Sequence, residues 1–365
     1  MHILVILPRW VGDLVMTTPM LRAVRAHYGT TARITGVAKP MFAGLLEGTP
    51  WLDDLVAYDR RSRDPHRRFL AVARRLRADP ADVALIVPNS LSTAALAWAG
   101  GARRRVGYAR HGRRLLLTDP LFAPRATGGK AGLAGWWRIE PDSPAGHAMD
   151  LAERIGVPRG PLTLELATTA ADEARADAVL TRLFPPAVAG PAGPLLVFND
   201  NGAFGPSKAW GPDRFAALSR LAIERLPGAR VLVHCGPGDR DEAREIVRRA
   251  GHAAVQSLAD EPDLPFGLSK AVLRRASVVV SSDSGPRHIA AAFGTPTIVL
   301  HGPMDPRLSR SEHRHLVEMR IDLPCSPCGR RVCPLRHHDC MRLLTVEDVG
   351  SRMVRLLEDA RVSSP

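Results

Sequence analysis

The stretch of residues 277–303 limits the fold of this chain more than any other part of the sequence. It reads SVVVSSDSGPRHIAAAFGTPTIVLHGP. The β-branched run Val278–Ser281 and the apolar run Thr297–His301 predict two short buried strands, and residues 286–293 between them predict a helix. Gly294 stands where a left-handed residue would end that helix. The stretch therefore predicts a strand, a turn, a helix and a second strand.

The turn before this helix has the composition of a phosphate-binding site. Residues 281–285 are small and include the carboxylate of Asp283 directly before the helix. Free backbone N–H groups and the helix dipole favour an anion at such a position. Asp283 would repel phosphate, so we expect it to orient the turn or to accept from a hydroxyl, and we expect His288 to point back toward the turn. The alternative is that Asp283 and Ser284 only cap the helix, which is the commonest role of such residues.

Composition predicts two domains and anionic partners. A length of 365 residues with 45% hydrophobic content is enough for two cores. The formal charge of +13 favours nucleic acid, an acidic membrane surface or a phosphorylated substrate. Aromatic residues make up only 5% and do not interleave with basic ones, as single-stranded nucleic acid would need, so we expect no nucleic-acid partner. No window approaches the roughly 18 apolar residues of a membrane span, and the N-terminus does not resemble a signal peptide, so we expect a soluble, cytoplasmic protein.

Strand and helix patterns alternate along the whole chain. In the first half the strand patterns lie at residues 3–7, 32–38, 55–58 and 83–87, and in the second half at 195–199, 230–235, 278–281 and 297–301. Helical spacing separates them, which predicts an α/β protein of two similar halves, each with a parallel sheet covered by helices. The predicted domains are residues 1–170 and 195–342, joined by a linker at 171–194 and followed by a helix and tail at 343–365. A long Gly-, Pro- and Arg-rich loop is expected at 123–146.

Two charged residues in glycine-containing turns are candidates for chemistry. Asp13 follows the first strand, at the carboxyl edge of the predicted sheet, where it is either a helix cap or a general base. Lys208 lies in a Gly/Ser loop ahead of a helix, in a chain where only four of the 50 basic residues are Lys. It suits a point charge that reaches phosphate oxygens, and the alternative is a solvated surface lysine.

Four of the five cysteines cluster near the C-terminus. Cys325, Cys328, Cys333 and Cys340 follow the pattern C-x2-C-x4-C-x6-C, with two histidines, at 337 and 338, close by. This density resembles metal-site spacing, and a cytoplasmic setting argues against disulfides. A structural Zn²⁺ and a compact loop of reduced cysteines are the two alternatives.

Three motifs together resemble glycosyltransferase family 9, the ADP-heptose:lipopolysaccharide heptosyltransferases. They are ILVILPRWVGDLVMTTPMLRAV from residue 3, NGAFGPSKAWGPDRFAAL from residue 201, and SSDSGPRHIAAAFGTPTIVLHGPMDP from residue 281. A fourth segment, PNSLSTAALAWAGGARRRVGY from residue 88, also matches. The opening PRWVGD is most similar to the heptosyltransferase II branch. Residues 201–203, Arg287 and His301 depart from the usual family pattern.

The resemblance implies a GT-B fold, in which two Rossmann-like domains face each other across a cleft. It implies an inverting transfer of heptose from ADP-heptose to the phosphorylated inner core of lipopolysaccharide, with no cofactor required. The acceptor would be an anionic, lipid-linked saccharide, reached by peripheral contact at the inner face of the cytoplasmic membrane. A GT-B transferase or epimerase that uses another nucleotide sugar is the alternative. By the resemblance, Asp13 is the general base, Lys208 binds the diphosphate, and the nucleotide and diphosphate motif comprises Asp283, Ser284, Gly285 and His288.

Overall fold

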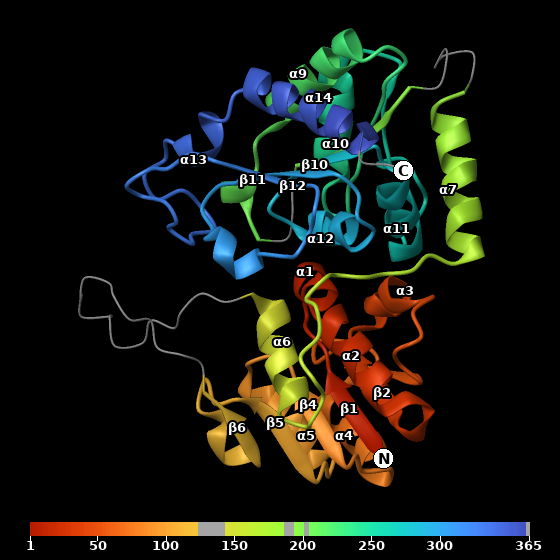
Figure 1. Cartoon of the computed structure of the whole chain (residues 1–365), viewed down its shortest axis with the longest axis vertical. Helices are drawn as coiled ribbons and strands as arrows, with labels where there is room; N and C mark the ends of the chain where they lie inside the picture. Colours follow the sequence, from red (N-terminus) through yellow and green to blue (C-terminus); the bar gives the residue numbers. More distant parts are fainter. Residues whose placement is uncertain (123–142, 186–192, 201–203, 363–365) are drawn as a thin grey trace. The chain divides into compact units, whose positions relative to one another are not determined.

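The computed structural model describes residues 1–122, 143–185, 193–200 and 204–362 (Figure 1). The chain forms two compact units, Met1–Leu164 with Arg307–Ser311, and Glu165–Pro306 with Glu312–Pro365. The greater part of the expected loop at 123–146 lies outside the described residues, as do residues 201–203. None of the helices within the described ranges combines the length and apolar character that crossing a bilayer requires.

The first unit contains a six-stranded parallel sheet with the order β3-β2-β1-β4-β5-β6. Its strands are β1 (His2–Ile6), β2 (Arg33–Ala38), β3 (Asp54–Ala57), β4 (Val83–Ile86), β5 (Arg104–Tyr108) and β6 (Asp119–Leu121). Its helices are α1 (Val11–Val15), α2 (Thr18–Tyr28), α3 (Ala43–Leu46), α4 (Phe69–Ala78), α5 (Leu91–Ala99) and α6 (Pro144–Glu153). Short 3₁₀ turns are η1 (Gly29–Thr31), η2 (Pro40–Phe42), η3 (Pro65–Arg67) and η4 (Arg113–Leu116).

Both faces of the first sheet are covered. Leu4 and Ile6 of β1 belong to one core with Val72 and Leu76 of α4. Ile3, on the opposite face by strand alternation, is fully buried as well. Because α4 packs against α5 and α2 packs against α6, the two helix pairs account for the two covered faces.

The second unit repeats the same winding. Its parallel sheet has the order β9-β8-β7-β10-β11-β12, which matches the first sheet strand for strand. Its strands are β7 (Leu195–Asn199), β8 (Arg230–Val233), β9 (Val255–Ser257), β10 (Val278–Ser282), β11 (Thr297–His301) and β12 (Leu316–Arg320). Its helices are α7 (Ala170–Leu183), α9 (Pro212–Arg225), α10 (Arg240–Ala250), α11 (Phe266–Arg275), α12 (Gly285–Ala292), α13 (Asp339–Arg342) and α14 (Val346–Val362). The 3₁₀ turn η6 (Pro206–Lys208) belongs to this unit, whereas residues 307–309 of the turn η7 (Pro306–Ser309) belong to the first unit.

This strand order is that of Rossmann-type sheets, in which ligands bind where the winding reverses direction. The reversal falls between β1 and β4 in the first sheet and between β7 and β10 in the second. The predicted α/β class with two similar parallel sheets is therefore confirmed. The strand, helix and strand expected in residues 277–303 are β10, α12 and β11, and Gly294 after α12 has the expected positive φ of 71°.

The domain boundary differs from the one expected at residue 170. The first compact unit ends at Leu164, and α7, which had been assigned to the linker at 171–194, is a regular helix packed against α11. Glu173 of α7 forms ion pairs with Arg274 and Arg275 of α11 at 2.8 and 2.7 Å. These contacts make α7 part of the second unit. The helix α14 in the expected tail at 343–365 packs against α9 and belongs to the same unit.

Candidate functional site

The reversal point of the second sheet brings Lys208 to Asp283. Asp283 directly follows β10, and Lys208 ends η6 in the connection between β7 and α9. The Lys208 ammonium donates to the Asp283 carboxylate at 2.8 Å and to the Asp283 backbone carbonyl at 2.6 Å. The side chains are only 12% and 6% exposed, respectively. Lys208 is therefore held in place within the site, and the alternative of a solvated surface lysine is wrong.

A second cation approaches the other oxygen of the same carboxylate. The Arg287 guanidinium, one turn into α12, donates from Nε to Asp283 Oδ1 at 2.9 Å and is fully buried. Burial alone would raise the pKa of the Asp283 carboxyl, but Arg287, Lys208 and His301 together hold that pKa well below its usual range. Asp283 is thus ionised, and two positive side chains surround one negative charge.

This arrangement is suited to an anion. Lys208 and Arg287 place two positively charged side chains on the single carboxylate of Asp283. The cluster lies at the N-terminus of the eight-residue helix α12, which begins at Gly285 and whose backbone N–H groups and dipole add to the positive potential. Figure 1 shows α12 between the strands and the loops at one edge of this sheet. The expectation that Asp283 orients the turn fits these contacts.

Helix capping does not explain Asp283 and Ser284. Ser284 is the N-cap residue of α12, yet no side-chain cap hydrogen bond is formed. Its hydroxyl instead accepts from the Asn199 amide at 2.9 Å. The orientation of the Asn199 amide is set by His234, whose Nδ1 atom lies 3.2 Å from the side-chain carbonyl oxygen of Asn199. Because that oxygen only accepts, Nδ1 of His234 carries the proton. Burial lowers the pKa of His234 to about 4, which keeps the ring neutral.

His288 lies deeper than the sequence suggested. Its residue is 3% exposed, and burial, followed by the neighbouring Arg287, lowers the pKa of its ring well below the usual value. Within the described part of the chain its Nδ1 atom has no hydrogen-bond partner. A buried polar atom in this state costs free energy. His288 is therefore a buried, neutral ring next to the charged cluster.

Asp200 holds the Lys208 loop from the other side. It follows β7 directly, and its carboxyl oxygens accept from the backbone N–H groups of Trp210 and Gly211 at 2.6 and 2.8 Å. Burial, with the nearby Glu242, raises the pKa of Asp200 to about 8, although the two N–H groups act in the opposite direction. Asp200 thus fixes the end of the loop that carries Lys208.

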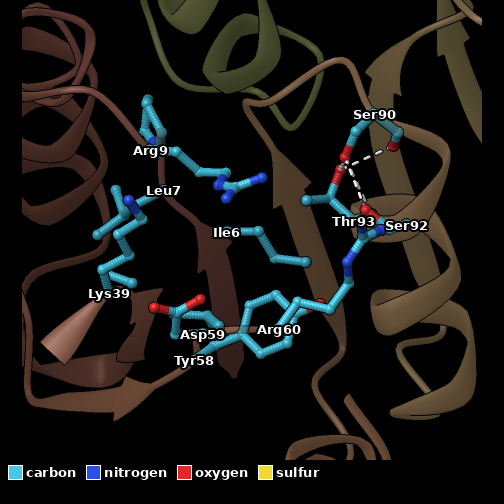
Figure 2. Close-up of a pocket in the computed structure, with 13 residues that line it drawn as sticks. Ile6, Leu7, Arg9, Lys39, Tyr58, Asp59, Arg60, Ser90, Ser92 and Thr93 are labelled. Carbon is cyan, nitrogen blue, oxygen red and sulfur yellow. Dashed lines mark hydrogen bonds between the residues drawn. The ribbon is translucent and has the colours of Figure 1, made fainter. Parts of the chain in front are cut away.

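The reversal point of the first sheet carries a separate pocket (Figure 2). Arg9, Lys39 and Arg60 follow β1, β2 and β3, so three basic side chains gather at the carboxyl ends of neighbouring strands. The hydroxyls of Ser90, Ser92 and Thr93, after β4 and in the first turn of α5, also line the pocket, as do Tyr58 and the carboxylate of Asp59. Figure 2 shows Arg9 directed into the space between Lys39 and Ser90, and Arg60 reaching toward Ser92. Ser90 caps α5 by accepting from the Thr93 N–H at 3.3 Å.

Asp13 belongs, like Arg9, to the connection between β1 and α2, which contains the short helix α1. It is the third residue of α1, is partly exposed, and is not the N-cap, which is Trp10. The capping role considered for Asp13 is therefore not the one it has. Its backbone carbonyl accepts from the Thr17 hydroxyl at 2.8 Å, which fixes the turn that presents its carboxylate.

The four clustered cysteines converge on one pocket in the second unit. Cys325, Cys328, Cys333 and Cys340 line it together with His337, His338 and Ser207. All four are free thiols. Among the described residues, however, no group of three or more His, Cys, Asp or Glu side chains is arranged to hold a metal ion. A structural Zn²⁺ and a compact loop of reduced cysteines stay the two alternatives, and metal analysis of the purified protein would distinguish them.

Several site residues escaped sequence reasoning. Arg287 was noted only as a departure from a pattern, although its spacing of four residues from Asp283 on a helix is that of an ion pair. Asp200 could have been identified as a candidate from the sequence, because it directly follows a buried strand. Arg9, Lys39 and Arg60 come together only through the strand order, which local patterns do not reveal.

Comparison with known proteins places the chain in a family. The model of glycosyltransferase family 9 (heptosyltransferase) matches residues 69–338, well over half of the chain. The chain belongs to glycosyltransferase family 9. Lipopolysaccharide heptosyltransferase 2 of Salmonella typhimurium is 26% identical over 322 residues, which cover 84% of either chain. Lipooligosaccharide heptosyltransferase 2 of Campylobacter jejuni is 24% identical over 172 residues, and this match spans about half of the relative, 52% of its length.

The family fold extends over the whole chain. The structure of Escherichia coli ADP-heptose lipopolysaccharide heptosyltransferase II superposes with a TM-score of 0.74 at 21% identity, covering 99% of this chain and 100% of that one. This likeness confirms the GT-B class of fold that the sequence predicted. In this family 9 chain, Asp13 lies in the first unit, whereas Lys208 and Asp283 lie in the second.

Proposed function

We propose that this family 9 chain is an inverting heptosyltransferase that transfers heptose from ADP-heptose to the phosphorylated inner core of lipopolysaccharide. The observation that carries the proposal is the cluster of Lys208 and Arg287 on Asp283 at the start of α12, because a diphosphate leaving group needs fixed positive charge. The names of the relatives, which are heptosyltransferases of lipopolysaccharide and lipooligosaccharide, support the choice of sugar and acceptor.

The proposed donor site uses the second unit. The diphosphate of ADP-heptose binds at the N-terminus of α12, where Ser284 and Gly285 begin the helix and Lys208 supplies a point charge. His288, whose buried Nδ1 atom has no hydrogen-bond partner in the described part of the chain, lies near Asp283 and Lys208. We propose that transfer itself requires no divalent metal, since side chains and the helix dipole supply the positive charge.

The proposed acceptor site uses the pocket of the first unit. Arg9, Lys39 and Arg60 provide charge for the phosphate groups of the acceptor, and the hydroxyls of Ser90 and Thr93 provide donors for sugar or phosphate oxygens. Asp13, in the same connection as Arg9, is the proposed general base. We propose that the second unit binds the donor and the first unit binds the acceptor.

The proposed step is a single displacement. The Asp13 carboxylate takes the proton of the acceptor hydroxyl while that oxygen forms a bond to the anomeric carbon of heptose. The bond from this carbon to the diphosphate oxygen breaks, and ADP leaves with the electron pair. Attack from the face opposite the leaving group inverts the configuration. The charge that grows on ADP is stabilised by Lys208 and by the N-terminus of α12.

Replacement of the proposed base tests this function. We expect Asp13→Asn to lower the rate of transfer at least about a hundredfold, because proton transfer to a positioned base contributes that much or more. ADP binding, measured by calorimetry, should stay unchanged because Asp13 lies outside the second unit. Asp54→Asn is a matched control, since Asp54 is exposed and pairs only with Arg75 at 3.2 Å among the ion pairs of the described residues. Full transfer activity in Asp13→Asn would contradict the proposal.

A GT-B transferase or epimerase with another nucleotide sugar is the second candidate. Thermal-shift measurements with ADP, UDP and GDP distinguish the two, because only the nucleotide that binds the folded protein raises its melting temperature. Stabilisation by ADP alone supports the heptosyltransferase proposal, and stabilisation by UDP or GDP instead contradicts it.

We also propose peripheral contact with the inner face of the cytoplasmic membrane. Leu115 in η4 is 93% exposed, Phe122 is 66% exposed, and the Arg114 guanidinium lies 5.8 Å from the centre of the Phe122 ring. Apolar side chains beside arginines suit an anionic bilayer surface. Co-sedimentation with vesicles that contain phosphatidylglycerol should be lost in Leu115→Glu, and equal binding of both proteins would contradict this contact.

A further inference from the structure

The loop that carries Lys208 rests on the cysteine-rich segment. This segment, residues 325–340, connects β12 to α13 and contains the four clustered cysteines. The N–H of Ser207 donates to the Arg331 carbonyl at 3.1 Å, and the Ser207 hydroxyl donates to the Arg330 carbonyl at 2.6 Å. The residue next to Lys208 is therefore bonded to a segment more than 120 positions away in the chain.

His338 completes this attachment. Its Nε2 atom lies 2.7 Å from the Ser207 carbonyl oxygen, and because a carbonyl can only accept, the ring donates its proton there. All three backbone and side-chain hydrogen-bonding groups of Ser207 thus have partners in the cysteine-rich segment. Ser207 is buried and lines the thiol pocket beside Cys325 and Cys340.

Close packing is a second sign that the cysteine-rich segment holds the loop that carries Lys208. A Cβ atom on Gly205, whose φ is 145°, would lie 2.9 Å from the Arg331 carbonyl oxygen, so the two backbones approach as only glycine allows. The Phe204 ring lies between two cations, with Lys208 Nζ 4.9 Å and Arg331 Cζ 5.6 Å from its centre. These contacts add to the hydrogen bonds of Ser207 in restricting the position of Lys208.

We infer that the cysteine-rich segment positions Lys208 for the diphosphate through the hydrogen bond from His338 to Ser207, so that His338 is a positioning residue for donor binding. A lysine ammonium on a flexible stem loses rotamer entropy when a ligand fixes it. A loop that is already held by the hydrogen bonds of Ser207 and by the packing of Gly205 reduces that loss. The inference rests on the proposed diphosphate role of Lys208.

A double-mutant cycle on ADP affinity tests the inference. We expect His338→Ala to weaken ADP binding about fivefold to tenfold, which corresponds to the loss of one hydrogen bond. In the Lys208→Ala background the same change should have no further effect, because it acts through that lysine. His338→Gln, which keeps an N–H donor of similar reach, should restore affinity to within about twofold. Ala and Gln face the same backbone cost at the positive φ of 55°, so their difference isolates the donor.

His337→Ala is the matched control within the same segment. The His337 ring accepts from the Asp339 N–H at 2.9 Å and forms no hydrogen bond to Ser207 among the described residues, so ADP affinity should change less than about twofold. Melting temperatures of all variants show that each is folded.

The possible failures can be told apart. A loss in His338→Ala that is equally large without Lys208, or one that His337→Ala reproduces, overturns the positioning role and leaves the donor site standing. Unchanged ADP affinity in Lys208→Ala contradicts the proposed donor site itself and the inference with it.

Discussion

At the scale of single residues, the site depends on one carboxylate shared by two cations. Asp283 accepts from Lys208 at 2.8 Å and from Arg287 at 2.9 Å, and all three side chains are nearly or fully buried. A buried charge is tolerated only when it is paired. Asp283 therefore allows two positive groups to lie together at the proposed diphosphate site.

Asp283→Asn should destabilise the protein strongly. The change removes the carboxylate charge that both Lys208 and Arg287 contact. Breaking a buried pair in this way costs about 3–5 kcal/mol of the free energy of unfolding. Urea denaturation measures this cost. Asp322→Asn is the control, because the exposed Asp322 pairs with Arg320 at 2.9 Å and such surface pairs contribute about 1 kcal/mol or less. Equal stability of the two variants would show that Asp283 does not balance the cations.

The carboxyl of Asp200 should make stability depend on pH. Its pKa is raised to about 8, above the ordinary value of 3.8 that applies to the unfolded chain. The folded protein therefore keeps this proton over a pH range in which the unfolded chain has lost it. The contribution of Asp200 to the free energy of unfolding is present in full below about pH 4 and declines as the pH rises toward 8.

Asp200→Asn should remove this dependence. Denaturant midpoints at pH 5 and pH 8 are expected to differ less in the variant than in the wild-type protein, with the wild type losing stability relative to the variant as the pH rises. The exposed Asp263, replaced by Asn, should leave the wild-type pH profile unchanged because, among the described residues, its ion pair is with Arg175 at the surface. A variant that keeps the wild-type profile would argue against a protonated Asp200.

At the scale of elements, α7 shows where local sequence patterns mislead. Its polar, alanine-rich composition suggested a connector, yet Thr169 and Asp172 form a reciprocal capping box at its start. Lys270 of α11, fully buried, lies 3.5 Å from Asp172. The residues of this cap can be read from the sequence. The docking of α7 on α11 cannot, because ion pairs between distant segments leave no periodic pattern in the sequence.

Thr169→Ala should weaken the second unit. The Thr169 hydroxyl accepts from the Asp172 N–H at 3.1 Å, and loss of such a cap costs about 1 kcal/mol in the free energy of unfolding. Urea denaturation followed by circular dichroism measures the change. Thr163→Ala, at an exposed position before the helix, should stay within about 0.5 kcal/mol of wild type. An effect no larger than that control would mean that α7 needs no cap.

The strands with continuous β-branched or apolar runs were predicted most accurately from the sequence. Thr297–His301 is β11 to the residue, and Val278–Ser281 is β10 but for its last residue. The short strand β9 and the edge strand β12 were not predicted, because β9 has three residues and β12 alternates with Glu318 and Arg320. Whether an edge or very short segment forms a strand depends on pairing with a neighbouring strand rather than on its own composition.

At the scale of the whole molecule, the same winding occurs twice. Both sheets place the connections after their first and fourth strands side by side, and each reversal point gathers basic side chains. In the first unit these are the exposed Arg9 and Arg60, and in the second the buried Lys208 and Arg287. The formal charge of +13 thus includes two kinds of cation that differ in their contact with solvent.

Salt should separate the two sites. Between 50 and 500 mM NaCl we expect the KM for a phosphorylated acceptor to rise several-fold, because exposed charges are screened over a Debye length of about 10 Å at 0.1 M. The affinity for ADP should fall less, since Lys208 and Arg287 are shielded from solvent. Steady-state kinetics and calorimetry at matched salt measure the two effects. Equal salt dependence of both would contradict the assignment of acceptor and donor to these two sites.

The sequence by itself determined the two-fold α/β winding and the position of Asp13, Lys208 and Asp283 at strand ends, because hydrophobic periodicity and turn residues act over short distances. Only the tertiary structure decided that Arg287 shares the Asp283 carboxylate, that Asp200 fixes the Lys208 loop, and that the cysteine-rich segment supports Ser207. These contacts join segments far apart in the chain or depend on burial. The strand order decides which of these charged and hydrogen-bonding groups become neighbours. That strand order is a property of the folded sheet.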